Sequence, residues 1–198
     1  MIRVGLSALL ALLVAFAAPA TAAEPAAAPD LAAVKLKAGR YVWKPELASE
    51  GPLEIVISLA DQRAFVYRGG TLIGVSTVSS GVKGRESPVG PFRILEKRRF
   101  YRSARYDDAP MPFMQRLNWY GIALHAGHVP GHRASHGCIR LPAGFAKALF
   151  AETQVGTYVY MTDDKLEGPE AALEMARLAE ATPLPPDRSP REFASGTD

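Results

Sequence analysis

Alternating apolar residues mark the strands that we predict for the first half of the chain. Leucine or isoleucine occupies every second position of residues 53–59, the period of a strand with one buried face. Two more apolar runs follow at residues 64–67 and 72–79, and Arg68-Gly69-Gly70 lies between them. Glycine supplies the positive φ of a tight turn, so these runs predict an antiparallel meander.

The second half mixes short apolar runs with two helical patterns. Phe145 and Leu149 lie four residues apart, the spacing of a packed helix face, and Pro142 suits a first helical position. Glycines and prolines interrupt residues 80–91, which we interpret as a structural loop. The remaining elements are predicted as strands at 92–95, 121–124 and 155–161 and as helices at 142–150 and 167–181. The pattern therefore predicts a mainly β fold.

Composition changes along the chain predict its domain organisation. Residues 1–23 have a basic start, an apolar core and small residues before residue 23, which predicts a secretory signal peptide; an uncleaved anchor is the alternative. Residues 24–50 are rich in Ala and Pro at their start, which predicts a linker. Within this segment, Tyr41-Val42-Trp43 could dock on the domain that follows. We expect one folded domain at 51–163 and a C-terminal helix with a disordered Pro-rich tail at 164–198.

Charge and cysteine content narrow the function. The formal net charge is +3, which favours an acidic polymer only weakly, and the absence of a basic helix argues against nucleic acid as a partner. The single cysteine, Cys138, cannot form an internal disulfide in an exported protein. We therefore expect this thiol to have a chemical role.

Residues 125–141 read HAGHVPGHRASHGCIRL and contain Cys138 together with all four histidines of the chain. Three interpretations compete: a thiol nucleophile with its base, a metal site, or a chance His-rich loop. A neighbouring imidazole, from His125 or His136, would raise the thiolate fraction of Cys138. The backbone N–H groups around Gly137 and Cys138 would then stabilise an oxyanion. We favour this interpretation.

A zinc site has support from residue types alone. The spacing of His125, His128, His132 and His136 is that of ligands on one helix face. Glycines and a proline within the stretch would break such a helix, and no Asp or Glu is present. We therefore predict no metal, and we interpret His128 and His132 as exposed loop residues or substrate contacts.

A basic segment with aromatic residues precedes the His-rich stretch. It is interpreted either as a solvated loop or as a lid whose cations meet the carboxylates of a peptide substrate. Its cations are Lys97, Arg98, Arg99, Arg102 and Arg105.

The motif Ser-His-Gly-Cys-Ile-Arg-Leu at residues 135–141, preceded by a His at the end of a strand, resembles the L,D-transpeptidase catalytic domain family (YkuD-like). The nine residues between His125 and Ser135 make a shorter loop than most members have. The resemblance implies a β-sandwich of mixed sheets, with a short helix after the catalytic Cys and a C-terminal helix.

The resemblance also implies residue roles. Cys138 would be the acylated nucleophile, His125 the proton donor and acceptor, and His136 and Gly137 would frame the oxyanion hole. Arg140 would pair with a substrate carboxylate or with a structural acid. The other candidate substrate-binding residues, several of which could equally be core, are Phe113, Trp119, Tyr120, Gly121 and Ser135.

The function implied is cysteine acyl transfer on peptidoglycan stem peptides, with no cofactor. A tetrapeptide stem would lose D-Ala and be transferred to an amine of another stem, of a lipoprotein or of an outer-membrane protein. Carbapenem-type β-lactams would inhibit it, and the protein would act in the periplasm or envelope. Two rivals remain: an L,D-carboxypeptidase or amidase on the same scaffold, and a non-catalytic envelope protein that binds zinc or wall peptide.

Overall fold

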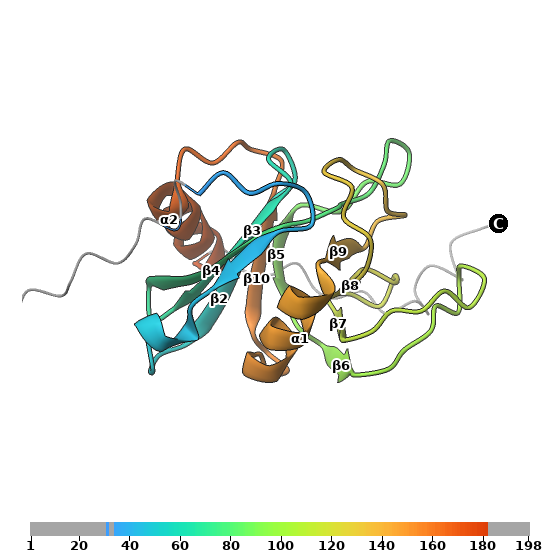
Figure 1. Cartoon of the computed structure of the whole chain (residues 1–198), viewed down its shortest axis with the longest axis horizontal. Helices are drawn as coiled ribbons and strands as arrows, with labels where there is room; N and C mark the ends of the chain where they lie inside the picture. Colours follow the sequence, from blue (N-terminus) through green and yellow to red (C-terminus); the bar gives the residue numbers. More distant parts are fainter. Residues whose placement is uncertain (1–30, 32–33, 182–198) are drawn as a thin grey trace, which may run out of the picture.

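The computed structural model describes residue 31 and residues 34–181 (Figure 1). The predicted signal peptide at 1–23, the start of the linker and the tail beyond residue 181 lie outside the described residues. Two β-sheets and two α-helices make up most of the described chain, together with a short 3-10 helix, η1 (Pro45–Leu47). The predicted mainly β fold of mixed sheets is therefore confirmed.

The larger sheet, sheet A, contains the predicted meander. Its strand order is β1-β4-β3-β2-β10-β5, with parallel pairing only between β2 and β10. The bounds are β1 (Tyr41–Trp43), β2 (Leu53–Ser58), β3 (Arg63–Arg68), β4 (Thr71–Thr77), β5 (Gly90–Arg93) and β10 (Tyr158–Thr162). The turn at Gly69 and Gly70 has positive φ at both residues, as the sequence predicted.

The smaller sheet, sheet B, has the order β6-β7-β8-β9, and only β8 and β9 are parallel. Its strands are β6 (Glu96–Arg98), β7 (Met114–Arg116), β8 (Ala123–Ala126) and β9 (Ile139–Leu141). β9 is also held on its other side, because the backbones of Ser79 and Arg140 exchange two hydrogen bonds of 3.0 Å. Sheet B is thus joined to the chain that leaves β4.

Several predicted boundaries differ from the structure. The strands expected at 121–124 and 155–161 are Ala123–Ala126 and Tyr158–Thr162. The strand expected at 92–95 begins at Gly90 and ends at Arg93, where it pairs with β10. The basic segment expected as a loop from Lys97 begins as strand β6. Lys97 donates hydrogen bonds to the carbonyls of Phe150 (2.8 Å) and Thr153, so it closes the C-terminal end of helix α1 (Ala143–Glu152).

The main core lies where sheet A, sheet B and α1 meet. Phe145 and Leu149 of α1 are buried there, as their spacing predicted. Trp43 of β1 packs edge-on against Phe145 with ring centroids 5.5 Å apart. β1 lies within residues 24–50, which we expected to be a linker, so the folded domain includes at least residue 41.

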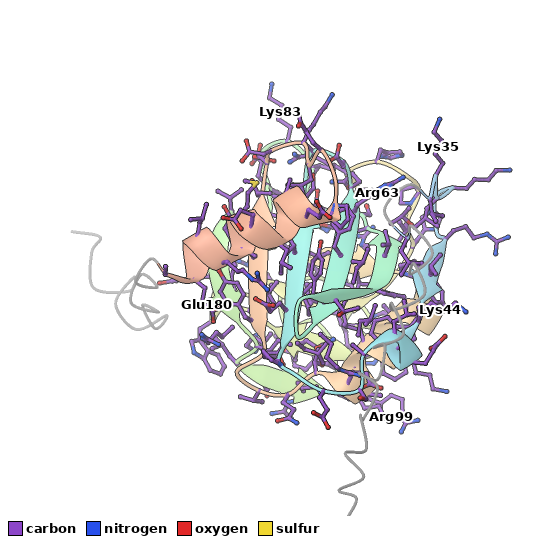
Figure 2. All side chains as sticks on the ribbon, turned by 90° about the vertical axis from the view of Figure 1, so that its left-hand side faces the viewer. Lys35, Lys44, Arg63, Lys83, Arg99 and Glu180 are labelled. Carbon is purple, nitrogen blue, oxygen red and sulfur yellow. The ribbon has the colours of Figure 1, made fainter. Side chains whose placement is uncertain are left out.

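The outer face of sheet A is covered by helix α2 (Pro169–Glu180), which lies across its strands in Figure 2. Ala172 and Ala176 are fully buried against this face, and the hydroxyls of Tyr67 and Tyr158 donate to carbonyls of α2. In Figure 1, α2 and sheet B lie on opposite sides of sheet A. Neither helix of the described chain has the length and apolarity to cross a membrane.

Candidate active site

The pairing of β8 with β9 decides which side chains share a face. Leu124 pairs with Ile139 and His125 with Arg140. Leu124 and Ile139 are buried in the main core, so the next residues, His125 and Arg140, point to the opposite face. Cys138 precedes Arg140 by two residues and lies on that same face. The register therefore makes Cys138 and His125 diagonal neighbours on adjacent strands.

A cavity of about 970 Å³ opens over this face. It is lined by both His125 and Cys138, and by six of the other predicted site residues: Trp119, Tyr120, Gly121, Ser135, His136 and Arg140. Phe113 is not part of the lining; its ring packs on Phe150 at 5.8 Å. The prediction of Phe113 as a substrate contact therefore has no support in the geometry, because its side chain is turned toward α1 and the core.

The loop of residues 135–138, called the catalytic loop after the role predicted for Cys138, is tied by the hydroxyl of Ser135. This hydroxyl accepts from Gly137 N–H at 3.1 Å and donates to the Cys138 carbonyl at 2.5 Å. Gly137 has φ +117°, and an added Cβ would lie 3.0 Å from Ile122, so only glycine fits without strain. The Ser87 hydroxyl donates to the Gly137 carbonyl at 2.7 Å, which supports the structural role expected for residues 80–91.

One predicted oxyanion-hole donor is occupied in this arrangement. The N–H of Gly137 is bonded to Ser135, so it does not point freely toward the thiol. Among the hydrogen bonds of residues 34–181, none uses the N–H of Cys138. The amide of Cys138 is accordingly the better candidate donor to an oxyanion.

The thiol of Cys138 donates to the Gly121 carbonyl at 3.2 Å. Burial raises the pKa of Cys138, and the Ala123 amide and the charges of Arg140 and Arg116 only partly oppose this. Because a carbonyl can only accept, the Gly121 contact also requires a protonated thiol. Both features favour the neutral thiol of Cys138 and oppose the thiolate that the sequence led us to expect.

His125 is almost fully buried, with 8% of its surface exposed. Its Nδ1 lies 2.8 Å from the Ala126 carbonyl, so Nδ1 carries the hydrogen and Nε2 has the free lone pair. Burial lowers the pKa of His125; the Ala126 hydrogen bond opposes this, and the Arg140 charge adds to it. Burial therefore favours a neutral imidazole at His125, as it favours a neutral thiol at Cys138.

A flap of residues 99–113 covers one side of the cavity. Backbone hydrogen bonds tie its two arms, from Phe113 to Arg99 (2.9 Å) and from Met111 to Tyr101 (2.8 Å). At its tip the Tyr106 ring stacks on His136, with centroids 4.7 Å apart. His136 is exposed and turned toward the flap. The flap thus contacts the catalytic loop directly.

The cations of the basic segment have separate roles. Arg102 is paired with Asp108 at 2.9 Å, and Arg105 donates to the Tyr120 carbonyl at 3.3 Å. Of the five predicted cations, Arg105 alone lines the cavity within the described chain. The position of the flap therefore supports the lid interpretation. Of the five cations, only Arg105 is placed to meet a substrate in the cavity.

The other histidines do not converge with Cys138. His128 lines the cavity and is exposed, and His132 is exposed with its Nδ1 3.0 Å from the Arg133 carbonyl. In the part of the chain that the structure describes, no three His, Cys, Asp or Glu side chains are grouped as metal ligands would be.

Comparison with known proteins places the chain in a family. The family model described as "L,D-transpeptidase catalytic domain" (YkuD) matches residues 52–161. The chain belongs to this family. Residues 52–161 contain the cavity, the catalytic loop and both sheets except β1 and the end of β10. A search among curated proteins found no match.

Solved L,D-transpeptidase structures share the fold at low identity. One from Stackebrandtia nassauensis is 24% identical, with a TM-score of 0.53, covering 60% of this chain and 58% of its own. LdtMt1 in complex with imipenem is 23% identical (TM-score 0.52; 56% and 58% covered). L,D-transpeptidase 3 from Mycobacterium tuberculosis with a faropenem-derived adduct is 21% identical (TM-score 0.51; 56% and 60% covered). The match spans under two thirds of each solved chain.

Some lining residues were not found from the sequence. Arg116 of β7 lines the cavity, is paired with Glu96 at 2.7 Å and lies over the rings of Tyr101 and Trp119. Met111, Met114 and Ala123 form an apolar cluster beside Cys138. The strand β7 was missed because it has only three residues, too few for an alternating pattern.

Proposed function

We propose that the protein is an exported L,D-transpeptidase of the cell envelope that acts on peptidoglycan tetrapeptide stems. The observation that carries the proposal is the register of β8 and β9, which puts Cys138 and His125 on one face beneath a large cavity. Membership of the family supports the reaction class. The signal-like residues 1–23 support export.

In the first half-reaction the thiol sulfur of Cys138 attacks the carbonyl at the L-centre of the stem's diamino acid. His125 Nε2 takes the thiol proton as the S–C bond forms, because Nδ1 already holds a hydrogen on the Ala126 carbonyl. The imidazolium then gives this proton to the nitrogen of D-Ala, and the C–N bond breaks. A thioester on Cys138 and free D-Ala result.

The tetrahedral intermediate carries a negative oxygen that needs donors. The N–H of Cys138 is suited to this because no acceptor in residues 34–181 uses it. Ser135 holds the loop in place through its bonds to Gly137 and Cys138. A donor of this kind contributes about 3 kcal/mol to transition-state stabilisation in enzymes where one has been removed.

In the second half-reaction an acceptor amine replaces D-Ala. The amine attacks the thioester carbonyl, His125 accepts one of its protons, and the collapsing intermediate returns that proton to the departing sulfur. The acceptor is an amine of another stem, giving a 3→3 cross-link, or an amine of a lipoprotein or outer-membrane protein. Water in the same position would make the protein an L,D-carboxypeptidase.

Incubation of the purified protein with tetrapeptide muropeptides, followed by mass analysis, tests the proposal. We expect dimers and free D-Ala from the wild type and neither from Cys138→Ala, whose folding is checked by circular dichroism. Free tripeptide without dimer would show that the protein hydrolyses the stem instead of transferring it. Turnover by Cys138→Ala would refute the assignment of Cys138 as the nucleophile.

Inhibition by β-lactams follows from the same chemistry. Solved relatives contain imipenem or a faropenem-derived adduct. We expect a carbapenem to add its whole mass to Cys138, since ring opening leaves the β-lactam nitrogen on the adduct. The matched control is Cys138→Ala, which would gain no mass.

A further inference from the structure

Arg140 is a half-buried cation in the cavity wall that no acid neutralises. Within residues 34–181 no carboxylate lies at ion-pair distance from its guanidinium, and none accepts a hydrogen bond from it. The other two arginines of the cavity differ. Arg116 is paired with Glu96 at 2.7 Å, and Arg105 donates to the Tyr120 carbonyl at 3.3 Å. The structural acid that the sequence left open for Arg140 is therefore absent from the described chain.

The backbone holds Arg140 firmly. Its N–H and carbonyl bond to Ser79 at 3.0 Å each, and it is the direct register partner of His125. Its aliphatic stem lies against Gly127, where an added Cβ would approach Cγ and Cδ to 3.0 and 3.1 Å. A long side chain whose stem is confined in this way loses less freedom when it binds a ligand.

Arg140 lies on the side of the site where the leaving group departs. His125 must give its proton to the nitrogen of the leaving residue, so that residue lies against His125. Arg140 is the neighbour of His125 across the strand pair. In an α-amino acid one carbon separates the nitrogen from the carboxylate, so a leaving residue held against His125 would carry its carboxylate toward the neighbouring Arg140.

We propose that Arg140 binds the terminal carboxylate of the single residue that leaves, and thereby limits donors to stems with one residue beyond the scissile bond. The assignment rests on the proposed function. A guanidinium and a carboxylate form two parallel hydrogen bonds, a geometry that an amide or an ester cannot reproduce. A second residue beyond the scissile bond would move the charge away from Arg140.

The same contact selects the acceptor. An amine that carries a carboxylate on its own carbon presents the same three-atom arrangement as the leaving residue. A free α-amino acid would therefore exchange with the leaving D-Ala, whereas its amide would not. The chemical class of both leaving group and acceptor is thus an α-amino carboxylate.

The test compares two donor peptides that differ only at the C-terminus, a tetrapeptide stem with a free carboxylate and its D-alaninamide counterpart. For the wild type we expect kcat/KM to be about 10- to 100-fold higher with the free carboxylate, the range of a hydrogen-bonded charge contact. Arg140→Gln should reduce this ratio to within about threefold of one, and Arg140→Lys should restore part of it. The ratio is informative because an effect of Arg140 on folding, or on the pKa values of Cys138 and His125 in the free protein, acts on both peptides alike.

Two further variants separate a binding role from a structural one. Gly127→Ala displaces the stem of Arg140 without removing its charge, so it should lower the ratio. Arg102→Gln removes a flap guanidinium that does not line the cavity and should leave the ratio unchanged. Alkylation of Cys138 by iodoacetamide shows that each variant keeps its site.

Equal rates of the wild type on both peptides, or a full preference retained by Arg140→Gln, would overturn the assignment while transfer itself stands. A folded wild type that cleaves neither peptide would instead overturn the proposed function, and the assignment with it.

Discussion

Ser135→Ala tests whether the catalytic loop is held by one hydroxyl. Ser135 is 1% exposed, and its Oγ bonds Gly137 N–H at 3.1 Å and the Cys138 carbonyl at 2.5 Å. Its backbone is fixed independently, because Ser135 N–H donates to Ser80 at 3.0 Å. The substitution therefore releases residues 137 and 138 and leaves residue 135 in place.

The expected loss of stability follows from the two bonds. At about 1 kcal/mol net for each hydrogen bond, the free energy of unfolding falls by about 2 kcal/mol. For a domain of this size that corresponds to a Tm lower by about 4–8 °C. The substitution should also displace the Cys138 amide and sulfur from the attack geometry and so lower kcat/KM about 100-fold.

Calorimetry and muropeptide kinetics measure the two effects separately. Ser58→Ala is the matched control, since Ser58 is also fully buried and its hydroxyl likewise accepts from a backbone N–H (Asp61, 3.0 Å) and donates to a carbonyl (Asp164, 2.8 Å). Ser58→Ala should lower Tm by a similar amount and leave kcat/KM within about twofold of the wild-type value. Ser135→Thr, which keeps the hydroxyl, should recover most activity. If both alanine variants lose the same small fraction of activity, the loop does not depend on Ser135 in the way argued.

Two other predictions concern the site's ionisation and the support of α1. Burial raises the pKa of Cys138 above the ordinary 9.0 and lowers that of His125 below 6.5. Alkylation of Cys138 by iodoacetamide should therefore be slow at neutral pH and accelerate only above pH 9. Rapid alkylation at pH 5–6 would instead show a preformed thiolate–imidazolium pair. Lys97→Met removes the two hydrogen bonds to the end of α1, which should lower the free energy of unfolding by about 2–3 kcal/mol in a denaturant titration. Lys147→Met on the exposed side of α1 should change it by less than about 0.5 kcal/mol, and an equal effect of both variants would contradict the capping role.

The elements predicted best are those whose pattern is local. Alternation at residues 53–59 and the glycine turn at residues 68–70 determine strand and hairpin without help from the rest of the chain, and both are confirmed. The short strands β6, β7 and β9 have three residues each. Their pairing depends on partners distant in sequence, such as Glu96 with Arg116, so no local pattern could reveal them.

The site was predictable in its residue types but not in its electrostatics. Residues 125–141 identified the cavity residues Cys138, His125 and Arg140. Burial opposes the thiolate expected from an adjacent imidazole, because it raises the pKa of Cys138 and lowers that of His125. Burial here comes from the flap, from sheet B and from Met111 and Met114, which no motif in the His-rich stretch encodes.

The neutral pair and the position of Arg140 are linked by charge. A thiolate–imidazolium pair would place the imidazolium beside the guanidinium of Arg140, its register partner, in a buried setting where like charges repel strongly. With a neutral imidazole this repulsion arises only during attack. A substrate carboxylate on Arg140 would remove it, because the guanidinium charge is then balanced before His125 takes the thiol proton. The residue proposed to select the substrate would therefore also favour the proton transfer, and a donor without the terminal carboxylate would react slowly even when it occupies the cavity.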